Sequence, residues 1–213
     1  MLSNKPAMKK FYERYWDGRE SEDTDIKWNI IKQNIPLSEN IHFLDFGCGT
    51  GALLSRILKV NPKLLATGAD VSKQAINHIK KKIPTANFYN IKVDEKLPFN
   101  DNSFDFILAA DVMEHIYDTE LIFSELKRVL KPKGKILISV PYHGMIKNIL
   151  ASLVAFDSYF DPTQAHIRFY TKGNLFKRMK NVGLKIIKHG YYGRFYPLSH
   201  AIYVVCEKSN ISG

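Results

Sequence analysis

The stretch FLDFGCGTGALL, residues 43–54, decides the fold of this chain. An apolar run ends at an acid, Asp45, and three glycines follow at alternate positions, Gly47, Gly49 and Gly51. Glycine permits a positive φ and lets a ligand approach the backbone closely. The pattern predicts a buried strand, a glycine-rich turn, and a helix whose first N–H groups are free to meet a ligand.

Apolar runs alternate with helical patterns along the rest of the chain. The run FDFILAA is continuous, as is typical of a strand that is buried on both faces. The expected strands are 41–45, 64–69, 87–91, 104–110 and 135–140, and the expected helices between them are 52–60, 72–82 and 121–130. A helix after Thr171 precedes two last runs, 184–189 and 201–207, which are expected to form an antiparallel pair. Repeated βαβ units predict an α/β fold with a mostly parallel sheet and helices on both faces.

Length and composition are those of one packed domain. The chain has 213 residues, of which 45% are hydrophobic and 24% charged. The two cysteines, Cys48 and Cys206, lie far apart in the sequence, which is typical of reduced thiols in a cytosolic protein. The first residues, MLSNKPAMKK, lack the apolar segment of a signal peptide, and no run of about 18 apolar residues predicts a membrane span. A cytoplasmic location is expected.

Positive charge is concentrated in the C-terminal part of the chain. The net charge is +10, and the part from Tyr142 onward carries ten Lys or Arg but only three Asp or Glu. Such an excess suggests an anionic partner, which is a nucleic acid, an anionic membrane surface or an acidic substrate. The alternative is a solvated lysine-rich surface without a partner.

Two carboxylates narrow the choice of ligand for the glycine loop. The spacing Gly47-x-Gly49-x-x-Ala52 also fits the fingerprint of dinucleotide-binding proteins. Asp45, however, would repel a pyrophosphate and attract a cationic group. Asp70 follows the second expected strand and can accept hydrogen bonds from both hydroxyls of a ribose. A cation joined to a ribose, without phosphate, describes S-adenosyl-L-methionine (SAM).

Several further motifs occur in a fixed order over most of residues 41–189. They are LDFGCGTG, GADVS, NIKVDEKLPFNDNSFDFILAADVMEHI, ELKRVLKPKGKILISVP and HIRFYTKGNLFKRMKNVGLKII. In these motifs the chain resembles the class I SAM-dependent methyltransferases, of the small single-domain type that includes the ubiquinone and menaquinone methyltransferases. The resemblance implies a Rossmann-like seven-stranded sheet with its last strand antiparallel. It also implies an N-terminal helical cap over residues 1–40, a methyltransferase domain over 41–213, and an acceptor lid over 145–160.

The resemblance implies a role for each residue of the cofactor site. Asp45 and the three glycines would lie along the methionine portion of SAM, and Asp70 would hold the ribose hydroxyls. The remaining contacts would be Val71 and Asp94 at the adenine, Ala110 at the methionine ammonium through its carbonyl, and Asp111 and His115 at the floor of the site. The alternative for Asp111 and Glu114 is that they are acids favoured at a helix N-terminus. The alternative for His115 is a packing role.

Two histidines are candidates for the base that removes a proton from the methyl acceptor. His143 follows the fifth expected strand, and His166 precedes the late helix. Histidine suits a phenol or enol acceptor because its pKa lies near neutrality. In quinone-type relatives a histidine lies near the position of His166, which is therefore preferred. Each histidine has the alternative role of anchoring the lid. No second cluster of carboxylates is visible, so no metal is predicted.

The segment MIKNILASLVAFDSYF, residues 145–160, is apolar and nearly uncharged. It is expected to be a lid over the acceptor, with a dimer surface or a membrane-dipping helix as alternatives. Because this segment adjoins the basic C-terminal part, peripheral contact of the protein with an anionic membrane is also expected. The expected activity is O- or C-methylation of a small quinone- or lipid-like acceptor. The N-terminal aromatics Tyr12, Tyr15 and Trp16 are expected to cap the cofactor.

Other function classes fit the sequence less well. A methyltransferase acting on a tRNA wobble-base carboxylate is supported by the basic charge, although a nucleic acid is the less favoured partner. Enzymes that methylate base amino groups usually carry Asn/Asp-Pro-Pro-Tyr where this chain has AADVMEH. A SAM-binding module without activity is disfavoured because Asp45 and Asp70 are both present. A nicotinamide oxidoreductase is disfavoured by Asp45 and by the DVMEHI stretch.

Overall fold

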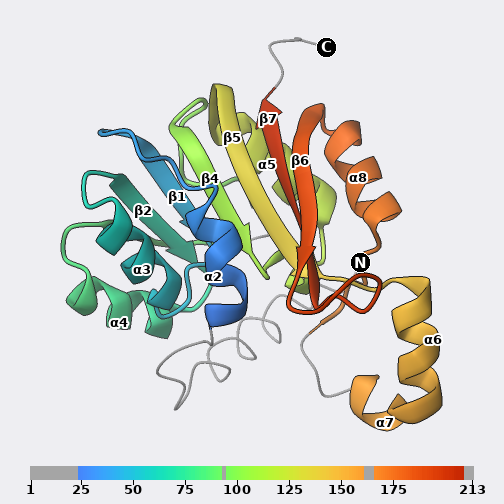
Figure 1. Cartoon of the computed structure of the whole chain (residues 1–213). Helices are drawn as coiled ribbons and strands as arrows, with labels where there is room; N and C mark the ends of the chain where they lie inside the picture. Colours follow the sequence, from blue (N-terminus) through green and yellow to red (C-terminus); the bar gives the residue numbers. More distant parts are fainter. Residues whose placement is uncertain (1–23, 93–94, 161–165, 209–213) are drawn as a thin grey trace.

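A seven-stranded sheet runs through the molecule, with helices on both of its faces (Figure 1). The computed structural model describes residues 24–92, 95–160 and 166–208. The strands are β1 (His42–Phe46), β2 (Leu65–Asp70), β3 (Asn87–Asn90), β4 (Phe104–Ala110), β5 (Leu130–Pro141), β6 (Leu184–Tyr192) and β7 (Ala201–Lys208). The helices are α2 (Asp25–Lys32), α3 (Ala52–Val60), α4 (Lys73–Lys82), α5 (Thr119–Val129), α6 (Met145–Val154), α7 (Phe156–Tyr159) and α8 (Lys172–Asn181), with a short 3₁₀ turn η1 (Met113–His115).

The sheet has the order β3-β2-β1-β4-β5-β7-β6. The first five strands of this order are parallel, and β7 runs antiparallel to both β5 and β6. The predicted sheet and its antiparallel last strand are therefore confirmed. The chain turns from one half of the sheet to the other next to β1, and open α/β sheets bind ligands at this switch point. The glycine loop follows β1 directly, so the fold places it there.

Alternate residues of the central strands bury opposite faces of the sheet. Phe43 packs with residues of α2, α3 and α4, whereas its neighbour Leu44 packs with residues of α5 and α8, and both are fully buried. The same alternation in β4 explains why the FDFILAA run carries no polar face.

Most predicted elements agree with the structure to within two residues, because the sequence carries their capping residues. The hydroxyl of Ser72 accepts a hydrogen bond from the Ala75 N–H and caps α4 at the predicted place. The main difference is β5, which begins at Leu130 rather than at residue 135. Leu130 is fully buried and pairs with Phe104, after which the pairing register shifts and Lys133 adopts a φ of 63°. Burial of Leu130 thus ends α5 one residue early.

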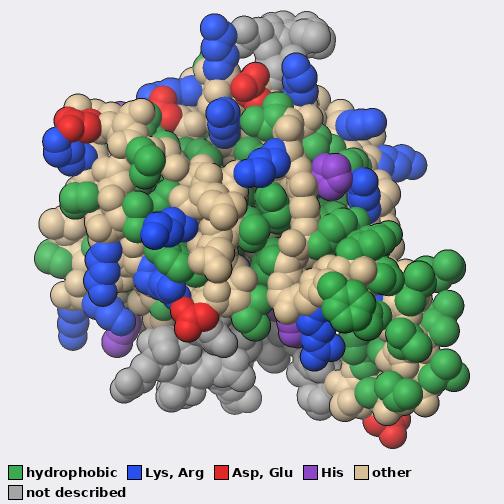
Figure 2. Space-filling model, viewed as in Figure 1, with side chains coloured by type: hydrophobic (Ala, Val, Ile, Leu, Met, Phe, Trp, Pro, Cys, Tyr) green, Lys and Arg blue, Asp and Glu red, His purple; other side chains and the backbone are tan. Residues whose placement is uncertain are grey.

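Two helices project away from the sheet, α6 and α7 (Figure 1). Neither contains a buried residue, and their apolar side chains gather at one corner of the molecule (Figure 2). None of the described helices is long and apolar enough to cross a membrane. Tyr12, Tyr15 and Trp16 lie outside the described residues, so the expected N-terminal cap stays a prediction.

Candidate cofactor and acceptor site

The glycine loop between β1 and α3 has a backbone that other residues would adopt only with strain. Gly47, Gly49 and Gly51 have φ values of 78°, 49° and 79°. A Cβ on Gly47 would lie 2.3 Å from Cγ2 of Val112, and one on Gly51 would lie 2.1 Å from Cδ1 of Ile79. Two of the glycines therefore let neighbouring side chains close over the loop, in addition to any contact with a ligand.

A small pocket opens at the carboxyl ends of β1 and β4, beside this loop. It is lined by Asp45, Gly47, Cys48, Thr50, Ala52, Leu53 and Ala110. Asp45 is buried, and the pKa of the Cys48 thiol is raised well above its usual value, first by burial and then by the Asp45 and Asp70 carboxylates. A pocket with this acidic surrounding suits a cationic ligand, as the sequence predicts for Asp45 and Ala110.

Asp70 ends β2 and connects the glycine loop to α4. One carboxylate oxygen accepts a hydrogen bond from the Gly49 N–H at 2.9 Å, and the other accepts one from the Ser72 N–H at 2.8 Å. Burial raises the pKa of Asp70, and these two hydrogen bonds lower it. A carboxylate has about four lone-pair sites, so this one can still accept the hydroxyls of a ribose. Its position fits the predicted role, which stays a prediction.

The adenine end of the expected site is described only in part. Val71 packs against the core beyond β2, and its carbonyl accepts a hydrogen bond from the Asn90 side chain at 2.8 Å. Asp94 lies outside the described residues.

Asp111 follows β4 in a strained conformation and is the centre of a polar network. Its φ is 56°, which is uncommon for a residue with a side chain. Lys27 of α2 pairs with its carboxylate at 2.6 Å, and the hydroxyls of Ser139 and Tyr192 donate to it at 3.1 and 3.4 Å. Burial and the Asp111 charge raise the pKa of Tyr192, so its phenol remains a hydrogen-bond donor. Four elements distant in sequence thus meet at this carboxylate.

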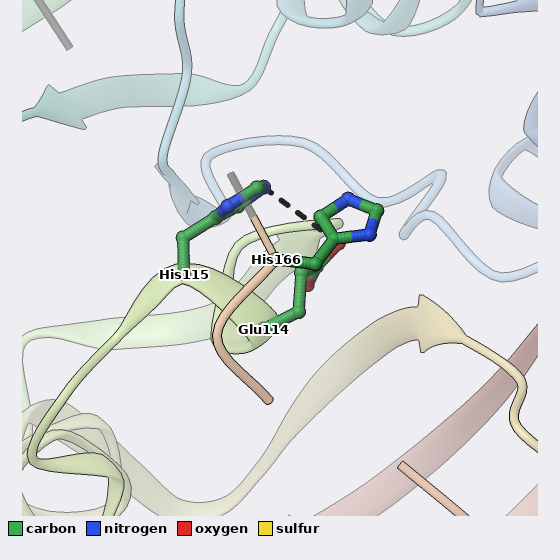
Figure 3. Close-up of side chains that lie close together, drawn as sticks. All are labelled: Glu114, His115 and His166. Atoms are coloured by element: carbon green, nitrogen blue, oxygen red, sulfur yellow. Dashed lines mark ion pairs between the residues drawn. The ribbon is translucent and has the colours of Figure 1, made fainter. Parts of the chain in front are cut away.

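Glu114, His115 and His166 lie close together (Figure 3). The rings of His115 and His166 are 5.0 Å apart, and Nε2 of His115 is 3.9 Å from a carboxylate oxygen of Glu114. Glu114 is an acid in the first turn of the 3₁₀ helix η1, whereas Asp111 precedes that helix. The helix α5 begins at Thr119 with Asp118 as its cap, because the 3₁₀ turn of residues 113–115 intervenes.

His143 follows β5 and contacts the lid. Its Nδ1 lies 3.3 Å from the hydroxyl of Tyr159 in α7, which itself donates to Oδ1 of Asn148 in α6 at 3.0 Å. The direction of the hydrogen bond between His143 and Tyr159 depends on the His143 tautomer. Nε2 of His143 is buried, and no described residue forms a hydrogen bond with it.

Burial lowers the pKa of His143 to about 4, and the positive charge of Lys147 adds to this effect. The unfolded chain therefore binds a proton here at a higher pH than the folded chain does. Stability should fall as the pH drops from about 6.5 to about 4, by a few kcal/mol at most from this group. We expect His143→Gln to lose this part of the acid sensitivity, as measured by urea unfolding at several pH values.

The exposed His78 provides the matched control, and His78→Gln should keep the pH dependence of the natural chain. Identical slopes for His143→Gln and the natural chain between pH 4 and 6.5 would contradict the assignment.

The sequence did not predict Lys27 or Glu114 as members of the site. Lys27 had one weak signal, since it is a charged residue among the apolar residues of an amphipathic helix. Tyr159 lies in the expected lid and Tyr192 in a tyrosine-rich link expected at the acceptor wall, but the sequence did not indicate their contacts with His143 and Asp111.

Comparison with known proteins agrees with this geometry. Residues 44–138 match the family model described as a methyltransferase domain. A tRNA U34 carboxymethyltransferase of Nautilia profundicola is 33% identical over 165 residues, which are 74% of this chain and 54% of that protein. A ubiquinone biosynthesis O-methyltransferase of Colwellia psychrerythraea is 26% identical over 156 residues, which are 70% of this chain and 62% of that protein. The chain therefore spans little more than half the length of these relatives.

A solved structure shows that the fold is shared. The crystal structure of a SAM-dependent methyltransferase from Aquifex aeolicus aligns with a TM-score of 0.70 at 18% identity, covering 92% of this chain and 97% of that one. Residues 44–138 therefore carry a methyltransferase domain. Together with the glycine loop and the sheet order, these findings support a class I SAM-dependent methyltransferase that resembles the ubiquinone-biosynthesis enzymes.

Proposed function

We propose that the protein methylates an oxygen or carbon atom of a small apolar acceptor, of quinone or lipid type, with SAM as the methyl donor. The proposal is supported by one arrangement, in which His143 contacts Tyr159 of the apolar helix α7, and His166 interacts with Asp111, the residue that follows Ala110 of the glycine-loop pocket. The bound cofactor would supply a methyl group on a positively charged sulfur. The residues of the chain would position the acceptor, exclude water and remove the acceptor's proton.

The proposed roles follow the positions of the side chains. Asp45, Asp70 and the Ala110 carbonyl would hold the cofactor at the carboxyl ends of β1, β2 and β4. His143 is neutral at physiological pH, and its Nε2 can accept a proton in the tautomer that carries the hydrogen on Nδ1. The acceptor would lose that proton as it gains the methyl group. His166, whose pKa burial also lowers, is the second candidate for this step.

A second candidate function is methylation of a carboxylate on tRNA. The Nautilia profundicola relative is named for transfer of a carboxymethyl group to U34 of tRNA, so its name supports tRNA as the acceptor class but not the group transferred. The net charge of +10 favours it as well. A carboxylate acceptor is already ionised at neutral pH and needs no base. Loss of His143 would then leave the activity on RNA nearly unchanged, whereas it would lower methylation of a phenol or enol.

The two functions are separated by incubating the purified protein with methyl-labelled SAM and an extract of its own host. Label in the organic phase supports the quinone or lipid acceptor. Ribonuclease-sensitive label supports the tRNA acceptor instead. A protein that binds SAM in calorimetry but labels no fraction would be a binding module, and both proposals would fail.

We further propose that α6 and α7 contact an anionic membrane that contains the acceptor. Their exposed apolar side chains are Met145, Ile146, Ile149, Leu150, Leu153, Val154, Phe156 and Phe160. These residues form one continuous corner of the surface (Figure 2). The basic C-terminal part complements an anionic lipid surface, whereas two positively charged copies would repel each other. The cytoplasmic location expected from the sequence is compatible with such reversible contact and stays a prediction.

Replacing Leu153 and Val154 together by aspartate should release the protein from vesicles. These side chains are 76% and 82% exposed, and burying each in lipid is worth about 1.5–3 kcal/mol. We expect binding to phosphatidylglycerol-containing vesicles to fall at least about tenfold in a sedimentation assay. Leu37→Asp, at a leucine that is 72% exposed between α2 and β1, should keep wild-type binding.

Equal vesicle binding by the double variant and the control would contradict the proposal. A double variant that changes only the oligomeric mass in gel filtration, with no effect on vesicle binding, would identify the corner as a dimer surface instead.

A further inference from the structure

Two histidines and one carboxylate meet from segments 51 residues apart, although the sequence predicts no metal site. Glu114 and His115 belong to the 3₁₀ turn after β4, and His166 belongs to the segment before α8. One possible ligand atom from each residue lies within 4.8 Å of the other two. Figure 3 shows the His166 segment crossing the turn so that the three side chains gather on one side of it.

Backbone hydrogen bonds hold the two segments in this register. The Glu114 carbonyl accepts hydrogen bonds from the N–H groups of Ile167 and Arg168, both at 3.0 Å. The Tyr170 hydroxyl donates to the Met113 carbonyl at 3.3 Å, and the Arg168 guanidinium donates to the carbonyls of Ile116 and Tyr117. These contacts place His166 against Glu114 independently of any attraction between their side chains.

The chemistry of the three groups suits a divalent metal ion. Two imidazoles and a carboxylate are the ligand set of catalytic zinc sites and of other first-row metal sites that leave positions open. The Glu114 side chain is fully buried, so its carboxylate is held in one place beside the two rings.

The cluster must contract a little to bind. Two ligand atoms that each lie about 2.1 Å from one metal ion can be at most about 4.2 Å apart. The three ligand atoms here lie within 4.8 Å of one another, so they must move closer. His115 and His166 are both half-buried, so rotation of their rings can close this difference without moving the sheet. Glu114 is fixed by burial and would be the anchoring ligand.

We propose that Glu114, His115 and His166 bind a divalent transition-metal ion, which holds an oxygen atom of the methyl acceptor beside the cofactor pocket. The role in catalysis rests on the proposed function, whereas the binding site does not. Coordination would lower the pKa of a bound hydroxyl. As the O–CH₃ bond forms and the donor's S–CH₃ bond breaks, the hydroxyl proton would pass to the neutral His143.

The site is tested by titrating metal-free protein with Mn²⁺ and Zn²⁺ in a calorimeter. We expect one equivalent to bind, and we expect His166→Ala to weaken that binding at least about tenfold. Glu114→Gln should do the same. Since Glu114 is buried and its variant can unfold, His166→Ala is the decisive change. His78→Ala, at an exposed histidine in α4, controls for binding of metal to surface imidazoles and should change nothing.

SAM binding, measured in the same instrument without metal, reports that each variant is folded. No binding by the natural chain, or equal affinity for His166→Ala and His78→Ala, would overturn the proposal. Metal binding that is lost in His166→Ala while no acceptor is ever methylated would keep the site and reject the proposed function.

Discussion

Replacing Asp70 with alanine is expected to weaken SAM binding by about a hundredfold or more. Hydrogen bonds to a charged group contribute about 1.5–3 kcal/mol each, and the proposed site would lose two of them, one to each ribose hydroxyl. The change also removes the acceptor of the Gly49 and Ser72 N–H groups, which fix the glycine loop against α4. Both effects act on the same side of the pocket. Calorimetric titration with SAM gives the affinity directly.

Control variants separate lost contacts from lost structure. Asp70→Asn keeps one oxygen for a backbone N–H but turns its NH₂ group toward the other, so it should unfold at a lower temperature than the natural chain and still bind SAM weakly. Asp101→Asn removes a carboxylate that is 66% exposed and pairs with Arg128 outside the pocket. It should leave the affinity for SAM unchanged. Unchanged affinity in Asp70→Ala would show that this carboxylate does not bind the cofactor.

The fold could be predicted because its signals are local and repeated. Continuous apolar runs such as FDFILAA distinguish strands that are buried on both faces, and Ser72 and Thr171 mark helix starts by their capping hydroxyls. The boundary between α5 and β5 was misplaced because it is set by a long-range contact. Leu130 pairs with Phe104, and no feature of the sequence near Leu130 indicates that pairing.

The residues of the candidate site also differ in how well the sequence predicts them, and the reason is again whether their position depends on local or long-range contacts. Its expected cofactor residues follow single strand ends, where the residues themselves suggest Asp45 and Asp70 and the resemblance adds Ala110. The structure places Asp45 and Ala110 in one pocket, with Asp70 hydrogen-bonded to the loop beside it. Its acceptor half is assembled from α2, the turn after β4, the lid and the segment before α8. Lys27 reaches Asp111 across 84 residues, and such a contact has no signature in sequence spacing.

Replacing His166 with alanine is expected to lower kcat for the apolar acceptor by about a hundredfold or more, while the affinity for SAM changes by less than about twofold. Either role proposed for this residue gives that result, because a base and a metal ligand both act on the acceptor oxygen and neither contacts the glycine loop. The loss should appear in single-turnover measurements at saturating acceptor, with His78→Ala as the matched control. Retained kcat in His166→Ala would exclude both roles, and full activity on RNA in the same variant would favour the carboxylate acceptor, which is ionised before it binds. The test is specific because the His166 ring lies close to the fully buried Glu114 carboxylate, whereas the control residue His78 is exposed in α4.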